Sequence, residues 1–395
     1  MKPLQDQPYS SSAVGLQRTF GVEEEFLLVD PASGQPVPVA ERALRHVTRN
    51  PGTAGGPTLA LEVKQEQLEV IGPVCSRLQQ LAEAILLGRM MADTAARAVG
   101  ARAVALATSP LSATSTLVQQ PRYLKMAARF HLTLREQLTC GFHVHVHVAS
   151  GEEGVAVLDR IRRWLPVVLA LSANSPFWQG TNTGYSSFRY QAWSRWPTAG
   201  PYEQFGSLRE YRRHVEALLA SGVLLDEGMV YFDARLSRSH PTVEVRIADV
   251  CLEAAHATIL AAVVRALVER AAQEWWAGVP APRLPAEQLR LASWMASDAG
   301  VEGNLMHPLM YVPCPATEAV QALLTHIRPA LVSSGDEEYV RLGLAGILAF
   351  GTGSHLQRAA MVSSQSLAAV VMDAVERTHG TATETPGRAR HLHST

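Results

Sequence analysis

The chain has 395 residues, of which 47% are hydrophobic and 18% are charged, and its formal net charge is -1. This near-neutral balance gives no reason to expect nucleic acid or an acidic membrane surface as a partner. No run of about 18 apolar residues occurs, no leader-type apolar segment is found, and the four cysteines are widely spaced, so we expect a reduced, cytoplasmic protein that does not enter a membrane.

Strand patterns and helix patterns alternate along the chain. Strands are predicted for residues 19–30, 60–70, 101–108, 141–148 and 240–249. Helices are predicted for residues 77–99, 155–171, 206–220, 253–275, 286–297, 316–332 and 364–377. Polar residues alternate with apolar ones along the strands, whereas a buried parallel sheet would show continuous apolar runs. The sequence therefore predicts an α+β fold in which a curved, mostly antiparallel sheet has helices packed on one face and leaves the other face open.

The organisation of the chain indicates one large domain. We expect residues 18–378 to form it, with a loose segment at 1–17 and a flexible tail at 379–395. The Ala-rich helices at 77–99 and 253–275 are apolar enough to fill a core or a subunit interface. No lysine follows a glycine anywhere in the chain, which excludes a phosphate loop of the G-x-x-x-x-G-K-[ST] type.

Acidic residues occupy one side of the first two strand patterns. In "GVEEEF", Glu23 and Glu25 share one face of a strand, while Glu24 points to the other with the apolar residues. In "LEVKQEQLEV", Glu62 and Glu69 stand near the two ends. These strands offer carboxylates on one side and apolar side chains on the other.

Two later strand patterns add imidazoles and a charged pair. In "GFHVHVHV", His143, His145 and His147 share one face and the valines share the other. In "TVEVRIAD", Glu244 and Arg246 share a face, opposite Val243, Val245 and Ile247. Each pattern has the same two-sided character as the acidic strands.

If these strands are neighbours, one open face carries about five carboxylates, several imidazoles and an arginine. Like charges this close repel strongly unless a cation neutralises them. Carboxylate oxygens with one or two imidazoles suit Mg²⁺ or Mn²⁺, and metal ions held in this way commonly clamp the phosphates of a nucleotide. The other interpretation is an ordinary solvated sheet face that happens to use these residues. The strand patterns alone leave both interpretations open.

Longer stretches identify a family. The segments "FGVEEEF", "CGFHVHV", "LSANSPFWQGTNTGYSSFRYQAWSRWPTAGP" and "TVEVRIAD" resemble the type 2 glutamate–cysteine ligases, also called carboxylate–amine ligases. The resemblance runs over residues 18–378, and the segment at 171–201 is its most specific part. It implies a glutamine synthetase-like fold whose metal and nucleotide site is built from an E-x-E strand, a second glutamate pair, an H-x-H strand and an E-x-R strand.

The resemblance carries roles onto residues of this chain. It implies metal ligands at Glu23, Glu25, Glu62, Glu69, His143 and Glu244. It implies nucleotide contacts from His143, His145 and Arg246, and catalytic roles for Glu25, Glu69 and Arg246. Arg189 and Arg195 lie in the specific segment and are the candidates for gripping a substrate carboxylate or phosphate. His147 falls where the family has no histidine, and we interpret it as incidental.

The implied activity is ATP-dependent amide formation, a γ-glutamyl amide being one form. ATP phosphorylates a carboxylate to an acyl phosphate, and an amine then displaces phosphate, so that ADP and phosphate are released. Mg²⁺, with Mn²⁺ as an alternative, would bridge the phosphates. Three other classes stay open: a phosphoryl transferase of the same fold, a zinc-dependent hydrolase that uses His143, His145 and His147, and a non-catalytic descendant.

The substrates implied are a small carboxylate, such as an amino acid, and an amine. The chain departs from the family at Ser109 in "ATSP", where a histidine is common, at Asp298, where an arginine is common, and at Ile71 or Gly72, where a threonine is commoner. Because of these departures, the resemblance does not fix glutamate and cysteine as the substrates. The resemblance also leads us to expect a homodimer.

Overall fold

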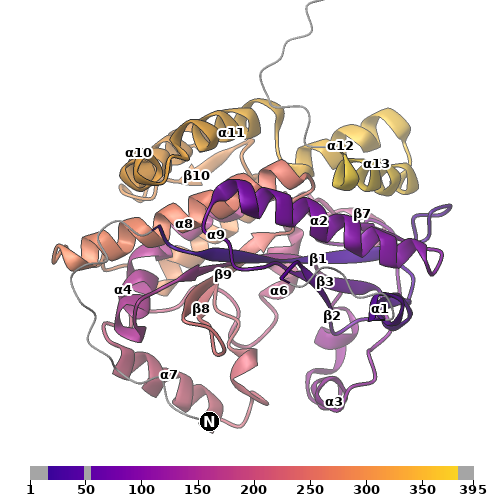
Figure 1. Ribbon diagram of the computed structural model, residues 1–395, viewed down its shortest axis with the longest axis horizontal. Coiled ribbons are helices and arrows are strands. Elements are labelled where there is room, and N and C mark those ends of the chain that lie inside the picture. The colour runs from indigo at the N-terminus through magenta and orange to yellow at the C-terminus, as the bar shows by residue number, and fades with distance from the viewer. Residues whose placement is uncertain (1–16, 49–54, 381–395) are drawn as a thin grey trace, which may run out of the picture.

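A single antiparallel sheet of seven strands runs through the molecule (Figure 1). The computed structural model describes residues 17–48 and 55–380. The strand order is β2-β3-β1-β5-β9-β8, and β4 pairs with the far end of β1. The strands are β1 (Phe20–Val29), β2 (Thr58–Leu61), β3 (Gln67–Ile71), β4 (Arg102–Val104), β5 (Gly141–His147), β8 (Ala234–Leu236) and β9 (Thr242–Asp249). Every pairing is antiparallel, as the polar alternation of the strands predicts.

Two long helices cover one face of this sheet (Figure 1). They are α2 (Leu78–Arg97) and α8 (Ala254–Trp276), close to the ranges predicted from the Ala-rich patterns. The helix α8 contacts β5 on one side and helices of an outer layer on the other, so it is buried almost all round. Of the two destinations expected for these apolar helices, the core of this chain is the one observed.

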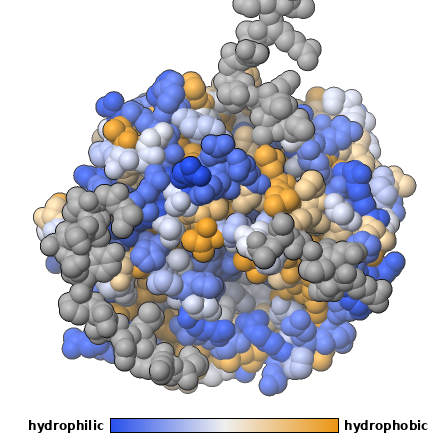
Figure 2. All heavy atoms as spheres, in the orientation of Figure 1, coloured by the Kyte–Doolittle hydropathy of each residue, from blue (hydrophilic) through white to orange (hydrophobic). Residues whose placement is uncertain are grey.

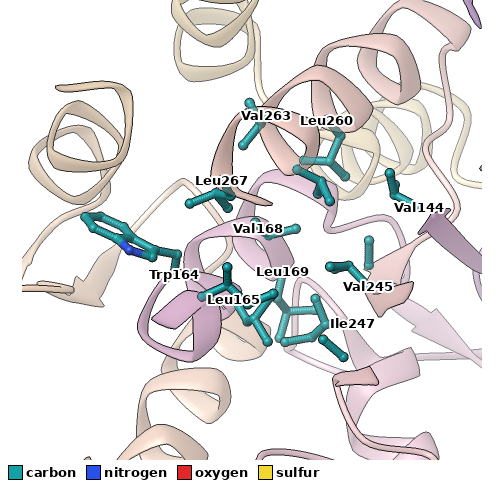
Figure 3. Packing of buried hydrophobic residues seen from close by; sticks show 14 of the residues in the cluster. Val144, Trp164, Leu165, Val168, Leu169, Val245, Ile247, Leu260, Val263 and Leu267 are labelled. Atoms are coloured by element: carbon teal, nitrogen blue, oxygen red, sulfur yellow. The ribbon is translucent and has the colours of Figure 1, made fainter. Parts of the chain in front are cut away.

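Interlocking aliphatic side chains hold the helices on the sheet (Figure 3). Val144 of β5 and Val245 of β9 project from the sheet toward Leu260 and Val263 of α8, and all four are at most 2% exposed. Burial of apolar area contributes about 25 cal/mol per Å², so this layer is a principal source of stability. The same alternation that buries these valines turns the charged residues of each strand to the opposite face.

The remaining helices form an outer layer and the flanks of the sheet. The outer layer, above α2 and α8 in Figure 1, contains α10 (Ala316–Ser334), α11 (Glu337–Phe350), α12 (Gly353–Ser364) and α13 (Leu367–His379). The others are α1 (Ala40–Thr48), α3 (Pro121–Arg135), α4 (Gly151–Ile161), α5 (Leu165–Ser172), α6 (Phe188–Trp193), α7 (Leu208–Ala220) and α9 (Ala286–Ala299). Two short 3-10 helices, η1 (Arg162–Trp164) and η2 (Glu227–Met229), and two hairpins, β6–β7 (Phe177–Trp178, Thr181–Asn182) and β10–β11 (Asn304–Met306, Pro313–Pro315), complete the fold. In Figure 1, α7 and α3 lie at opposite ends of the sheet on the side away from α2 and α8.

Three predicted elements are wrong in detail. The strand predicted at 60–70 is two strands, β2 and β3, that pair with each other across a turn. The strand predicted at 101–108 is only three residues long. The helix predicted at 155–171 is α4 and α5 with η1 between them, because Pro166 has no N–H and begins a new helix instead of continuing the old one.

The pattern at 364–377 also needs correction. Gln365 has φ +53° and ends α12, and α13 begins at Leu367. The sequence patterns did not predict the helices α1, α3, α6 and α11 or most of α12.

The predicted loose segment and the predicted tail lie outside the described residues, apart from Gln17, His379 and Gly380. No helix in the described part of the chain combines the length and the apolar character needed to cross a membrane. On the face shown in Figure 2, apolar residues lie between polar ones, as expected because polar atoms alone cannot cover a protein.

Candidate active site

The strand β1 divides three consecutive glutamates between the two faces of the sheet. Glu24 points toward α2, is 1% exposed and accepts a 2.6 Å hydrogen bond from Arg89 Nη2. Glu23 and Glu25 point to the opposite face, where their side chains are 24% and 13% exposed. The division predicted from "GVEEEF" is therefore observed. On the opposite face, the neighbours of Glu23 are the imidazoles of His143 and His145.

The register of the sheet aligns the charged residues of neighbouring strands. Glu23 lies opposite His143 of β5, and Glu25 lies opposite Glu69 of β3. On the other side of β5, His145 lies opposite Glu244 of β9. Residues that are opposite each other have Cβ atoms about 4.5–5.5 Å apart, so the register alone concentrates charge on this face.

Glu62 joins this group from the turn between β2 and β3. In a continuous strand, Glu62 and Glu69 would point to opposite faces, because they are an odd number of residues apart. The chain reverses between them instead, and Glu62 is close enough to Glu25 for the Glu25 charge to act on it. Burial, and then the charge of Glu25, raise the pKa of Glu62 to about 8. Burial and the charge of Glu62 likewise raise the pKa of Glu69.

His143 lies between two of the glutamates. Its Nδ1 is 3.0 Å from Glu23 Oε2, and its Nε2 is 3.8 Å from Glu25 Oε1. Burial and the nearby charge of Arg246 lower the pKa of His143. Burial opposes ionisation of Glu23, but the hydrogen bond to His143 and the nearby imidazole of His145 outweigh this and hold the pKa of Glu23 well below its usual range. The imidazoles thus keep Glu23 ionised.

Two groups of three side chains on this face could each hold a divalent cation. One is Glu23, His143 and Glu244, and the other is Glu25, Glu69 and His143. Within each group, ligand atoms lie within 4.8 Å of one another. Carboxylate oxygens with one imidazole nitrogen suit Mg²⁺ or Mn²⁺. Burial, and then the charges of Glu62, Glu23 and Glu25, raise the pKa of Glu69, and a bound cation would relieve the part that is due to charge.

His145 has one buried ring nitrogen without a hydrogen-bond partner among the described residues. His145 Nδ1 is 3.1 Å from Thr242 Oγ1, whereas His145 Nε2 is buried, makes no hydrogen bond and lies 3.4 Å from Glu23 Oε1. Burial opposes protonation of His145, but Glu23 and then Glu244 outweigh it and raise its pKa. His147, the third histidine of the strand, belongs to neither of the two cation-binding groups found in the described residues.

Arg246 and Arg189 lie beside the carboxylates. Arg246 Nη1 donates to Glu244 Oε1, and its Nε is buried without a hydrogen bond. Arg189 is 3% exposed, donates to the Ile247 carbonyl at 3.2 Å and has its guanidinium alongside Gly141. A side chain at position 141 would clash with that guanidinium. The structure therefore brings both arginines to the edge of the acidic group.

Arg195 lies elsewhere. Its Nη1 is paired with Glu136 Oε2 and its Nε donates to the Ala192 carbonyl at 3.0 Å, with 34% of its side chain exposed. No contact in residues 17–48 and 55–380 joins Arg195 to the acidic group, so its substrate role stays a prediction. Ser109 is buried and donates to the Leu111 carbonyl within its own loop, and Asp298 is exposed on α9.

Two residues that sequence reasoning missed are tied to this face. Arg235 of β8 lies opposite Glu244 and pairs with it, Nε to Oε2 at 2.8 Å. Asp249, at the end of β9, accepts hydrogen bonds from Ser175 Oγ at 2.7 Å and Ser187 Oγ at 2.9 Å. Asp249 thereby anchors the loop that leads to Arg189. A hairpin alignment of "ARLSRSHPTVEVR" could have found Arg235, because it places Arg235 opposite Glu244.

The chain is similar to known proteins in sequence and in fold. A family model described as "Glutamate-cysteine ligase family 2(GCS2)" matches residues 19–369. A relative from Paenarthrobacter aurescens (strain TC1), named "Putative glutamate--cysteine ligase 2-1", is 53% identical over 366 residues, which cover 92% of this chain and 95% of that protein.

Two solved structures show the same fold. A glutamate–cysteine ligase from Francisella tularensis, in complex with AMP, superposes with a TM-score of 0.67 and 12% identity, over 93% of this chain and 90% of that one. A bifunctional glutathione synthetase from Pasteurella multocida superposes with a TM-score of 0.66 and 15% identity over 92% of this chain. The present chain spans about half of that protein (53%). The likeness confirms the predicted fold class.

Proposed function

The chain belongs to glutamate–cysteine ligase family 2 and is therefore an ATP-dependent ligase; we propose that it joins a carboxylate to an amine through an acyl-phosphate intermediate. In the first step, a carboxylate oxygen of the acyl substrate attacks the γ-phosphorus of ATP, and ADP leaves. In the second step, the amine attacks the carbonyl carbon and phosphate leaves. The products are an amide, ADP, phosphate and the proton lost by the amine.

The acidic face supplies what these steps need. We assign the metal ligands as Glu23, Glu25, Glu62, Glu69, His143 and Glu244. A divalent cation held there would screen the charge of the ATP phosphates and of the transferred phosphoryl group. Arg246, whose Nε has no hydrogen-bond partner among the described residues, is the side chain best able to donate to that phosphoryl group.

Binding and proton transfer fall to the neighbouring residues. His143 and His145 are assigned to the nucleotide, and Arg189 to the substrate carboxylate, because its guanidinium lies beside Gly141 at the start of β5. Glu69 and Glu25 are the carboxylates assigned to accept the proton of the attacking amine.

The single observation that carries the proposal is the convergence of five carboxylates, His143 and Arg246 on one face of the sheet. The experiment is incubation with Mg²⁺, ATP and pooled amino acids and amines, read by mass spectrometry for ADP and new amides. Once a carboxylate substrate is known, it is labelled with ¹⁸O. Transfer of one ¹⁸O atom to phosphate supports an acyl phosphate, and phosphate without label would contradict it.

The same experiment separates the alternatives. A phosphorylated product that forms without any amine would indicate a phosphoryl transferase. The absence of nucleotide turnover, together with zinc retained through purification, would indicate a hydrolase. The geometry does not favour this class, because among the described residues only His143 of the three strand histidines belongs to a cation-binding group. The homodimer and the cytoplasmic location stay predictions.

A further inference from the structure

The carboxylate of Glu244 binds two arginines at once. Arg235 holds it in a fork, with Nε 2.8 Å from Oε2 and Nη2 3.2 Å from Oε1. Arg246 Nη1 donates to the same Oε1. One oxygen of Glu244 is therefore shared by both guanidinium groups, whereas Oε2 is bound by Arg235 alone among the described residues.

Arg235 is fastened on its other side by the backbone. Its Nη1 donates to the Val230 carbonyl at 2.9 Å and to the Gly228 carbonyl at 3.2 Å, next to η2. A planar guanidinium with several donors in use cannot rotate away without losing them together. Arg235 is thus held rigidly, and it holds Glu244 in turn.

Arg246 is held by far fewer contacts. Glu244 is the only hydrogen-bond partner of its side chain in the part of the chain that the structure describes. Its Nε is buried and makes no hydrogen bond. A buried donor without a partner costs free energy, so the guanidinium of Arg246 retains donor capacity that an anionic ligand could use.

The charge around Glu244 explains why two arginines are tolerated on one carboxylate. Burial opposes its ionisation, but the charges of Arg246 and Arg235 outweigh this, so that Glu244 is an anion. It faces Glu23 and His143 in one of the two groups that could hold a divalent cation. A cation that binds Oε1 would compete there with Arg246 and with Nη2 of Arg235, whereas the contact of Arg235 Nε with Oε2 would stay in place.

We propose that these two arginines have separate tasks: Arg235 is a positioning residue that orients Glu244 for a divalent cation, and Arg246 leaves Glu244 Oε1 when the cation binds and turns to the phosphoryl group. The inference rests on the proposed function at one point, the presence of a cation between Glu23, His143 and Glu244. Cation binding would then prepare Arg246 for the nucleotide, so the two ligands would bind in a preferred order.

The test measures Mn²⁺ binding to the full chain without nucleotide, by electron paramagnetic resonance and by calorimetry. Arg235→Gln is expected to weaken Mn²⁺ binding by about 10–100-fold, the usual loss when a side chain that orients a metal ligand is removed. Arg246→Gln is expected to strengthen Mn²⁺ binding, on the order of tenfold, because the guanidinium that competes with the metal ion for Oε1 is removed. Arg341→Gln is the matched control. Arg341 forks Glu338 in the same way, with Nε 3.0 Å from Oε2 and Nη2 2.8 Å from Oε1, but on α11 in the outer layer of helices, and its loss should leave Mn²⁺ affinity unchanged.

Opposite signs for the two variants are the decisive result. If both arginines acted only through charge, removing either would strengthen Mn²⁺ binding, and this outcome would overturn the inference. Arg235→Lys keeps the charge but not the fork, and should weaken Mn²⁺ binding nearly as much as Arg235→Gln. If the melting temperature shows that Arg235→Gln does not fold, Arg235→Lys takes its place in the test.

The wild-type chain separates this inference from the proposed function. If it binds no Mn²⁺ at all, the metal assignment fails and the inference fails with it. If it binds Mn²⁺ and Arg235→Gln binds equally well, the division of tasks fails alone. In a further arm, Mn²⁺ should tighten the binding of a non-hydrolysable ATP analogue, which carries the γ-phosphoryl group, to the wild type more than to Arg246→Gln, and equal effects in both would count against the release of Arg246.

Discussion

His143 and Glu23 are partners in the ladder between β5 and β1, and Nδ1 of the imidazole is 3.0 Å from Oε2 of the carboxylate. The contact orients the ring, because a hydrogen bond at one nitrogen leaves the other to face a different neighbour. The other nitrogen, Nε2, faces the second cation-binding group. One imidazole is thus shared by both groups, and its orientation depends on Glu23.

Loss of the Glu23 charge should disable the site. We expect Glu23→Gln to lower ATP turnover by about 100-fold or more, because it removes a cation ligand and the anion that both imidazoles face. Steady-state ADP release measures the effect. Glu338→Gln is the control, since Glu338 is an exposed glutamate of α11 paired only with Arg341, and it should keep full activity. Equal activity of both variants would remove Glu23 from the site.

The adjacent Glu24 should affect stability instead. Arg89 is buried beside it and also donates to the carbonyls of Cys251 at 2.7 Å and Leu252 at 2.9 Å. Arg89→Met leaves Glu24 as a buried, unpaired charge, which typically costs about 3–5 kcal/mol. Urea unfolding should show this loss, and the double variant with Glu24→Leu should recover part of it. A double variant no more stable than Arg89→Met would contradict the ion-pair explanation.

Cation binding should release protons at neutral pH. The pKa of Glu62 is raised to about 8, so the cation-free protein retains the Glu62 proton at pH 7, and the pKa of Glu69 is shifted in the same direction. Mg²⁺ requires ionised carboxylates and would expel protons held there. Calorimetry in two buffers of different ionisation enthalpy counts them. Glu62→Gln should release fewer protons, and the same count in the wild type and the variant would assign the protons elsewhere.

The contribution of Glu62 to the stability of the cation-free protein, isolated by comparing the wild type with Glu62→Gln, should fall as the pH rises between about 4.3 and about 8. An unfolded glutamate loses its proton near pH 4.3, whereas folded Glu62 keeps its proton to about pH 8, so the native state binds more protons in this window and loses stability with rising pH. Urea unfolding at several pH values tests the sign. The low pKa of Glu23 acts only below this window, where stability falls as the pH falls. Saturating Mg²⁺ should reduce the dependence of the free energy of unfolding on pH in this window.

Gly141 should be required for the position of Arg189. A methyl group there would clash with the Arg189 guanidinium and approach His143 Nε2 to 3.1 Å. We expect Gly141→Ala to raise the KM for the carboxylate substrate by about tenfold or more and to cost about 1–3 kcal/mol of stability through overpacking. Gly380→Ala is the control, because a methyl group there meets neighbours only at 3.5 Å. An unchanged KM for Gly141→Ala would separate Arg189 from substrate binding.

Much of the site could be predicted because strands alternate with a period of two. That period separates Glu24 from Glu23 and Glu25, and it places His143, Glu244 and Arg246 on the polar side of their strands without any knowledge of the neighbours. The burial of Glu24 under α2 and the pairing of Glu23 with His143 agree with it. Local spacing sufficed wherever a residue lay inside a regular strand.

Residues outside the regular strands could not be placed in this way. Glu62 reaches the acidic group because the chain turns between β2 and β3, and a continuous strand would have sent it to the other face. Arg189 depends on a loop anchored by Asp249, 60 residues away in the sequence, and on the absence of a side chain at Gly141.

The sequence by itself determined which side chains lie on the polar face of each strand, because side-chain direction in a strand depends only on position along it. Only the tertiary structure decided which of these side chains meet, since the strand order and the register bring Glu23 to His143, and Glu244 to Arg235. The sharing of Glu244 between two arginines also belongs to the tertiary structure, because it depends on hydrogen bonds from β8 to the backbone beside η2.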